Sequence, residues 1–167
     1  MELLVIRHAD AGDAAAFAKS GRPDDERPLS PEGRKKMHQA ARGLRGIVPD
    51  IAVLATSPLV RARQTADIVA EEFGGLRIDT VPALRPTQPP AALAEWLARH
   101  RSDGVVAAVG HEPHLSETVG WLLTGEARSL IELKKGAACL LASDGWGPGA
   151  AVLRWALQPG QLRALGD

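Results

Sequence analysis

Short apolar runs alternate along the chain with segments in which apolar residues recur at helical spacing. The strand-length runs are 2–6, 51–55, 76–81 and 105–109. The helical segments are about 31–44, 58–73, 91–100 and 114–125. Ser30 before Pro31 is a typical helix start, and Gly74 is a typical stop. This alternation predicts strands that pair in parallel beneath helices.

Two further apolar runs, 137–142 and 150–157, are joined by a glycine-rich segment and predict an antiparallel hairpin on the sheet edge. With helices on both faces, the pattern indicates an α/β fold: a three-layer α/β/α sandwich with a mostly parallel sheet. The polar stretch 10–29 predicts a long excursion over the site, with one helical turn over 14–19. The chain has 167 residues and shows no repeat or linker, so we expect a single domain over 1–167.

Candidate chemistry lies where the strands end. Arg7 and His8 follow the first apolar run, and His111 follows the fourth one through Gly110. Arg61 lies in the first turn of the helix after the second run. Because ligands of open α/β sheets bind at the carboxyl ends of the strands, these side chains should converge on one anion site.

These residue types suit phosphoryl transfer. A neutral imidazole such as that of His8 can attack phosphorus to give a covalent phosphohistidine. The guanidinium groups of Arg7 and Arg61 bind phosphate oxygens in bidentate fashion, and a protonated or donating His111 adds a further donor. This set would neutralise a phosphoryl group without a metal or other cofactor.

The composition limits the classes of binding partner and the compartment that we expect. Lys and Arg number 20, as do Asp and Glu, so the net charge is +0 and gives no reason to expect nucleic acid or an anionic membrane. One cysteine excludes an intramolecular disulfide and suits a reducing compartment. The chain opens on a strand-like segment and has no run of about 18 apolar residues, so we expect a cytoplasmic protein.

Four segments resemble motifs of the histidine phosphatase superfamily, in the family's order. Residues 7–10 (Arg-His-Ala-Asp) resemble its RHG motif, and 57–65 (Ser-Pro-Leu-Val-Arg-Ala-Arg-Gln-Thr) resemble its SPLxRAxQT segment. Residues 110–113 (Gly-His-Glu-Pro) resemble its GHxP segment, and 27–33 (Arg-Pro-Leu-Ser-Pro-Glu-Gly) its RPLTxxG element. The last element and the short length resemble the phosphohistidine phosphatase SixA subfamily.

The resemblance implies a phosphoglycerate mutase-like fold, His8 as the nucleophile, Arg7 and Arg61 as phosphate clamps, and His111 as an electrostatic stabiliser. Two departures stand out. Ala9 replaces the usual glycine, and residues 82–89 lack the carboxylate that mutase-like members carry there. Mutase activity is therefore not expected, and Glu112 becomes the best candidate for a proton donor.

Other polar residues fit structural roles better. Arg63, His38 and His100 are expected on helix surfaces, and His114 could shape the mouth of the site. Cys139 has Gly145 six residues later, where a thiol phosphatase needs arginine.

We therefore expect a phosphatase that acts through phospho-His8 on phosphohistidine in proteins. The alternatives are a phosphatase of a small phosphorylated metabolite and a phospho-ligand binding protein without turnover. No P-loop and no HExxH zinc motif is present. An excursion that closes over the site would favour small substrates, whereas an open one would admit a protein.

Overall fold

The sheet is built around two strands whose side chains are apolar on both faces, β1 (Glu2–Arg7) and β4 (Val105–Gly110). They pair in parallel at the centre of a six-stranded sheet with the order β3-β2-β4-β1-β5-β6. The structure is a computed structural model, and it describes residues 1–167. The remaining strands are β2 (Ile51–Thr56), β3 (Ile78–Thr80), β5 (Ala138–Ser143) and β6 (Ala151–Leu157). The last two form an antiparallel hairpin, and β5 also runs antiparallel to β1.

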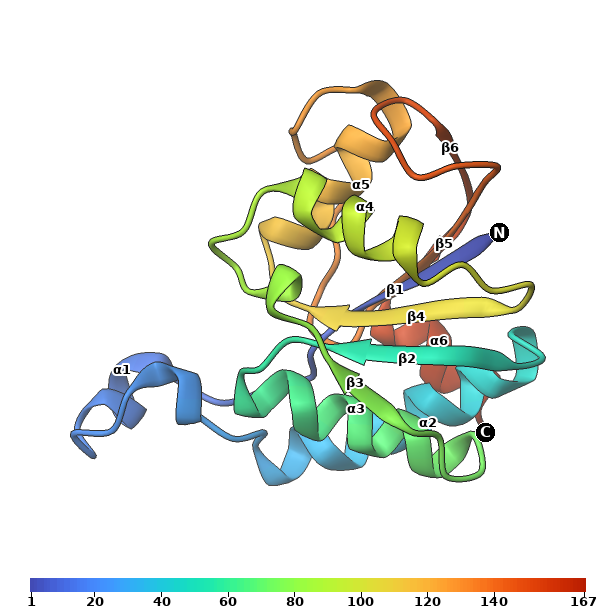
Figure 1. Cartoon of the computed structure of the whole chain (residues 1–167). Helices are drawn as coiled ribbons and strands as arrows, with labels where there is room; N and C mark the ends of the chain where they lie inside the picture. The colour runs from blue at the N-terminus through green and yellow to red at the C-terminus, as the bar shows by residue number, and fades with distance from the viewer.

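Helices cover both faces of this sheet (Figure 1). The helices are α1 (Ala14–Ala18), α2 (Pro31–Ile47), α3 (Val60–Glu72), α4 (Pro90–Arg99), α5 (His114–Thr124) and α6 (Pro159–Leu165), with 3₁₀ turns η1 (Asp24–Glu26) and η2 (Pro82–Leu84). In Figure 1, α2 and α3 lie below the sheet, and α4 and α5 lie above it. Helix α6 packs on α2 and covers the same face as α2. The three-layer α/β/α sandwich, the mostly parallel sheet and the edge hairpin are therefore confirmed.

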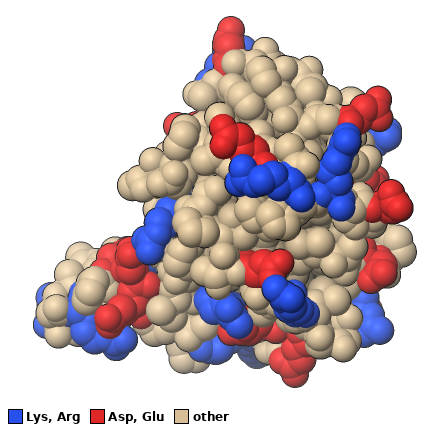
Figure 2. Space-filling model, in the orientation of Figure 1, with Lys and Arg blue, Asp and Glu red and all other residues tan.

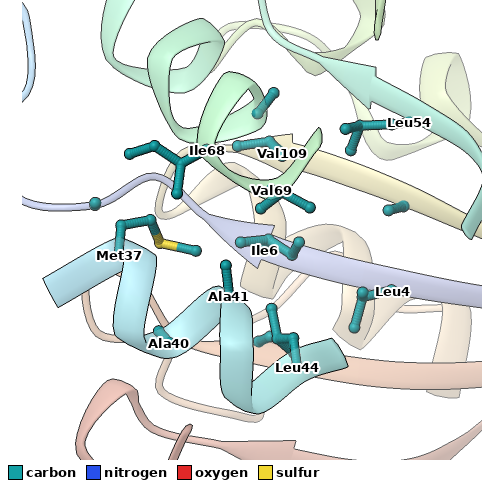
Figure 3. Close-up of a cluster of buried hydrophobic side chains, with 14 of the residues drawn as sticks. Leu4, Ile6, Met37, Ala40, Ala41, Leu44, Leu54, Ile68, Val69 and Val109 are labelled. Carbon is teal, nitrogen blue, oxygen red and sulfur yellow. The ribbon is translucent and has the colours of Figure 1, made fainter. Parts of the chain in front are cut away.

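Strand β1 supplies both halves of the core because its side chains alternate between the faces. Leu4 and Ile6 belong to the cluster with α2 and α3, which Figure 3 shows in close-up. Leu3 and Val5 belong to the cluster with α4 and α5. All four side chains are buried, and each such side chain contributes about 1.5–3 kcal/mol on burial. The strand that carries the candidate site is thus held rigidly on both sides.

Some boundaries differ from those expected. Helix α2 continues through Gly46 to Ile47, because the N–H of Val48 still reaches the carbonyl of Leu44 at 2.8 Å, and Pro49 follows. The expected strand over 76–81 shortens to three residues at the sheet edge.

Helix α6 and turn η1 were not predicted. Helix α6 packs on α2, where a Cβ on Gly43 would collide with the carbonyl oxygen of Leu162, so glycine is what allows the two backbones to approach. This contact joins residues that are far apart in the sequence and has no local signal.

Basic and acidic residues are interspersed over the face shown in Figure 2, in keeping with the zero net charge. None of the helices combines the length and the apolar character that crossing a bilayer requires.

Candidate active site

The parallel register brings the two histidine segments side by side. His8 and His111 each follow the last residue of a central strand, and the N–H of His8 donates to the carbonyl of Gly110 at 3.0 Å. On the other side of β4, the N–H of Ser57 donates to the carbonyl of Val109 at 3.0 Å. The convergence expected from the sequence is thus present at the carboxyl edge of the sheet.

His8 is buried and held in one tautomer. Its Nδ1 lies 2.7 Å from the carbonyl oxygen of Ala9, which can only accept, so Nδ1 carries the proton and Nε2 carries the lone pair. Burial lowers the pKa of His8 to about 4, and the positive charges of Arg61 and Arg7 act in the same direction. His8 is therefore a neutral imidazole near pH 7, with the lone pair of Nε2 available as a nucleophile.

His111 packs against His8, with ring centroids 5.1 Å apart and ring planes at 54°. Its Nε2 lies 2.8 Å from Oγ of Ser57, which orients the ring. Burial lowers the pKa of His111 to about 3, and the proximity of His8 and Arg61 adds to the effect. His111 is therefore a neutral hydrogen-bonding group in the free protein. The sequence allowed either a protonated His111 or a neutral one that donates a hydrogen bond, and the neutral one fits the structure.

Both arginines are anchored by protein groups. Nη1 of Arg7 donates to the carbonyl of Leu133 at 2.7 Å. Arg61, in the first turn of α3, donates from Nη1 to the carbonyl of Asp24 at 2.9 Å and pairs through Nη2 with the Asp24 carboxylate at 3.3 Å. Burial lowers the pKa of each guanidinium from its ordinary value of 12.5, yet an arginine remains charged in proteins.

Three buried nitrogens around His8 lack a hydrogen-bond partner: Nε of Arg7, Nε of Arg61 and Nδ1 of His111. A buried donor without an acceptor costs about 1–3 kcal/mol, so such groups in one place favour an acceptor-rich ligand. All three residues line the same cleft as His8. A tetrahedral oxyanion in the cleft would place acceptor oxygens beside these residues.

That cleft has a volume of about 330 Å³, and four cationic side chains line it with one carboxylate: Arg7, Arg27, Arg61 and Lys135 with Glu112. Asp24 pairs with Arg27 and Arg61, and Asp10 pairs with Lys135. The remaining excess of positive charge favours an anionic ligand. No group of three or more His, Cys, Asp or Glu side chains lies together in a way that could hold a metal ion.

Arg27 and Lys135 were missed as site residues. Arg27 lies in the motif-like segment 27–33, so the sequence carried a signal that was given no role. Lys135 carries no local signal: it comes from the turn before β5, where the N–H of Gly136 donates to the carbonyls of Arg7 and His8. Its Nζ lies 3.0 Å from the Asp10 carboxylate, and this hydrogen bond holds the pKa of Asp10 down at about 2.

The excursion between β1 and α2 projects from the body (Figure 1), and its residues Gly12, Ala14 and Arg27 line the cleft, so it forms one wall of the site. Its residues are exposed from Gly12 to Glu26, except for the partly buried Phe17. Arg27 closes its base by donating from Nη1 to the carbonyls of Ala11 and Gly12. The expected helical turn is present as α1, and the cleft beside it is open.

Of the remaining candidate residues, one lines the cleft and two lie elsewhere. Glu112 lines the cleft, and its Oε1 accepts the N–H of Ser116 at 2.8 Å. Arg63 pairs with Asp67 on the exposed side of α3. His114 is buried at the start of α5, away from the lining of the cleft, and burial lowers its pKa.

Comparisons with known proteins agree with these observations. The model of the histidine phosphatase superfamily (branch 1) matches residues 3–88. An uncharacterized protein of Picosynechococcus sp. is 34% identical over 137 residues, which cover 81% of this chain and 81% of that protein. The phosphohistidine phosphatase SixA of Escherichia coli is 27% identical over 166 residues, or 98% of this chain and 97% of SixA.

Among solved structures, the protein histidine phosphatase SixA complexed with tungstate superimposes with a TM-score of 0.82. The match covers 97% of this chain and 99% of that one, at 24% identity. The phosphoglycerate mutase-like fold implied by the motif resemblance is thereby confirmed.

Proposed function

The chain belongs to the histidine phosphatase superfamily, and we propose that it hydrolyses phosphohistidine in proteins through a covalent phosphoryl intermediate on His8. The observation that carries this proposal is the neutral, buried His8, with its Nε2 free and unpartnered donors of Arg7, Arg61 and His111 around it. A site that only bound phosphate would need the hydrogen-bond donors but no nucleophile.

In the first step the lone pair of His8 Nε2 forms a bond to phosphorus as the bond between phosphorus and the leaving nitrogen breaks. The leaving imidazole takes that electron pair and departs neutral when its other nitrogen carries a proton. The guanidinium groups of Arg7 and Arg61 neutralise the charge on the phosphoryl oxygens. His111 donates a further hydrogen bond to the same oxygens.

In the second step water attacks phosphorus and the bond to Nε2 breaks. His8 then takes back its electron pair while its own proton stays on Nδ1, and both protons of the water remain on the released phosphate, which leaves as the dihydrogen phosphate ion. The carbonyl of Ala9, 2.7 Å from Nδ1, holds that proton throughout and stabilises the positive ring of the intermediate. His8 therefore leaves as the same neutral tautomer that began the cycle.

A protein substrate is supported by the shape of the site. Much of the excursion projects from the body of the molecule (Figure 1), and only Gly12, Ala14 and Arg27 of it line the cleft, which leaves room for a phosphorylated side chain on a large partner. The similarity to SixA, a phosphohistidine phosphatase, extends over 98% of this chain. Both observations favour a macromolecular substrate over a small phosphorylated molecule.

The test is a side-by-side measurement of kcat/KM on one phosphohistidine protein and on a panel of sugar phosphates. We expect the phosphohistidine protein to be hydrolysed far faster, and the rate to survive EDTA because arginines supply the positive charge. A sugar phosphate preferred over the phosphoprotein would move the activity to small metabolites. Loss of activity in EDTA with recovery in Mg²⁺ would contradict the metal-free mechanism.

A further inference from the structure

Asp24 joins two cationic side chains at the base of the projecting excursion. Its Oδ1 accepts from Nε of Arg27 at 2.8 Å, and its Oδ2 lies 3.3 Å from Nη2 of Arg61. The backbone carbonyl of Asp24 accepts from Nη1 of Arg61 at 2.9 Å. One residue thus holds both terminal nitrogens of the Arg61 guanidinium.

The donors of Arg61 divide into two groups. The terminal nitrogens are engaged by Asp24, whereas the buried Nε has no partner and belongs to a residue that lines the cleft. An arginine side chain has several rotatable bonds, and holding one edge of its planar guanidinium fixes the direction of the other edge. Because Arg61 lines the cleft, Asp24 fixes where its guanidinium lies relative to a phosphoryl group bound there.

Asp24 is itself held in place. Arg27, only 9% exposed, donates to the carboxylate and also to the carbonyls of Ala11 and Gly12. The hydrogen bond from Arg27 holds the pKa of Asp24 below its ordinary value of 3.8. The carboxylate is therefore ionised near neutral pH, where it cannot donate a proton.

We infer that Asp24 is a positioning residue for phosphate binding and transfer, acting through Arg61 and anchored by Arg27. The inference rests on the proposed role of Arg61 as a phosphate clamp. It gives the base of the excursion, which also lines the cleft through Arg27, a part in the reaction.

The experiment is a double-mutant cycle with Asp24→Asn and Arg61→Ala, assayed by hydrolysis of an aryl phosphate. Removing a preorganised donor lowers the rate by about 10²–10³-fold. Leaving the Arg61 guanidinium in place but less well oriented should lower it by less. We expect Asp24→Asn to lower kcat about tenfold with a smaller change in KM. In the Arg61→Ala background the same substitution should change kcat by less than about twofold, because the group it aims is gone.

Two neighbouring acids provide matched controls. Asp25→Asn removes a charge that acts on Arg61 at longer range but makes no contact with it, since Asp25 pairs with Arg85 at 3.1 Å. Glu26→Gln alters the same 3₁₀ turn, where Glu26 pairs with the exposed Arg22. Both controls should stay within about twofold of the unaltered protein. An equal loss in Asp25→Asn would mean that net charge matters and that aiming does not.

The same four proteins of the cycle are measured for binding of inorganic phosphate by calorimetry, after thermal melting has shown that each is folded. We expect Asp24→Asn to weaken phosphate binding more when Arg61 is present than when it is absent. Equal effects in the two backgrounds, in rate and in binding, would overturn the inference. If the unaltered protein binds phosphate but hydrolyses nothing, the proposed function fails, and the binding cycle still decides the role of Asp24.

Discussion

Glu112 is the one carboxylate that lines the cleft, and its chemistry decides which leaving groups the site can expel. An alkyl phosphate expels an alkoxide and needs a general acid, commonly worth about 10²–10⁴-fold. A phosphohistidine can release a neutral imidazole whose proton is available near neutral pH, since the ordinary pKa is about 6.5. A site with no dedicated acid would therefore serve phosphoramidates much better than alkyl phosphates.

We predict that kcat/KM falls steeply as the pKa of the leaving group rises across aryl and alkyl phosphates, with phosphoramidate among the best substrates. Glu112→Gln should have little effect on any of them. Glutamine is the suitable substitution because its amide oxygen can still accept the N–H of Ser116. A flat dependence, or alkyl phosphatase activity that disappears in Glu112→Gln, would identify Glu112 as the proton donor.

The sequence alone was enough to predict which residues converge at the site when those residues lie close to the end of a strand. His8, His111 and Arg61 each lie within five residues of a strand's last residue, so the register of the sheet brings them together. Lys135 and Asp24 reach the site only through tertiary contacts of a turn and of a projecting excursion. No periodicity or motif encodes such contacts, and both residues were missed for that reason.

Helix α2 and the segment after His8 depend on one another. Oγ of Ser30, the N-cap of α2, donates to the Asp10 carboxylate at 2.8 Å and accepts the N–H of Gly33 at 3.0 Å. A Cβ on Gly33 would collide with the carbonyl oxygen of Asp10. The first turn of α2 thus fixes the backbone that follows His8.

We predict that Gly33→Ala lowers the free energy of unfolding by about 1–3 kcal/mol, as overpacking typically does, and reduces kcat by displacing Asp10. Gly46→Ala is the matched control in the same helix, because a Cβ there meets open space. It should be neutral or stabilise the protein by up to about 1 kcal/mol. Urea denaturation and aryl phosphate hydrolysis of both variants measure this. Equal stability of the two would refute the close approach.

The existence of most elements followed from periodicity, whereas their ends depended on packing. Ser30 and Pro31 correctly marked the start of α2. The helix continues past the expected end near residue 44 and through Gly46, because the loss from one glycine, about 1 kcal/mol, is small beside the contacts that α2 makes with α3 and α6. Helix α6 itself lay beyond the last strand pattern and is held by that same packing.

For the molecule as a whole, the buried histidines couple stability to pH. Burial lowers the pKa of His8 to about 4, that of His111 to about 3, and that of His114. Below the ordinary value of 6.5 the unfolded chain takes up protons that the folded chain does not, so unfolding becomes easier as the pH falls. The lowered pKa values of Asp10 and Asp24 change the free energy of unfolding only when the pH falls to about 3.8, the ordinary pKa of an aspartate, or below.

We predict that the free energy of unfolding, measured in urea, is highest above pH 6.5 and falls as the pH is lowered towards 4. Each such histidine contributes up to about 1.4 kcal/mol per pH unit in that window. In His8→Ala the slope should be shallower, whatever the variant's stability at pH 7. A slope identical to that of the unaltered protein would show that His8 is not held neutral by the fold.

The central claim is that the phosphoryl group passes through His8, and trapping the intermediate tests it most directly. The protein is mixed with a phosphohistidine substrate, quenched in alkali within the first turnover, and its peptides are analysed by mass spectrometry. We predict phosphorylation of the peptide that contains His8, and none in His8→Ala, which should still bind inorganic phosphate through Arg7 and Arg61. A phosphoryl group on another residue, or full turnover by His8→Ala, would contradict the account.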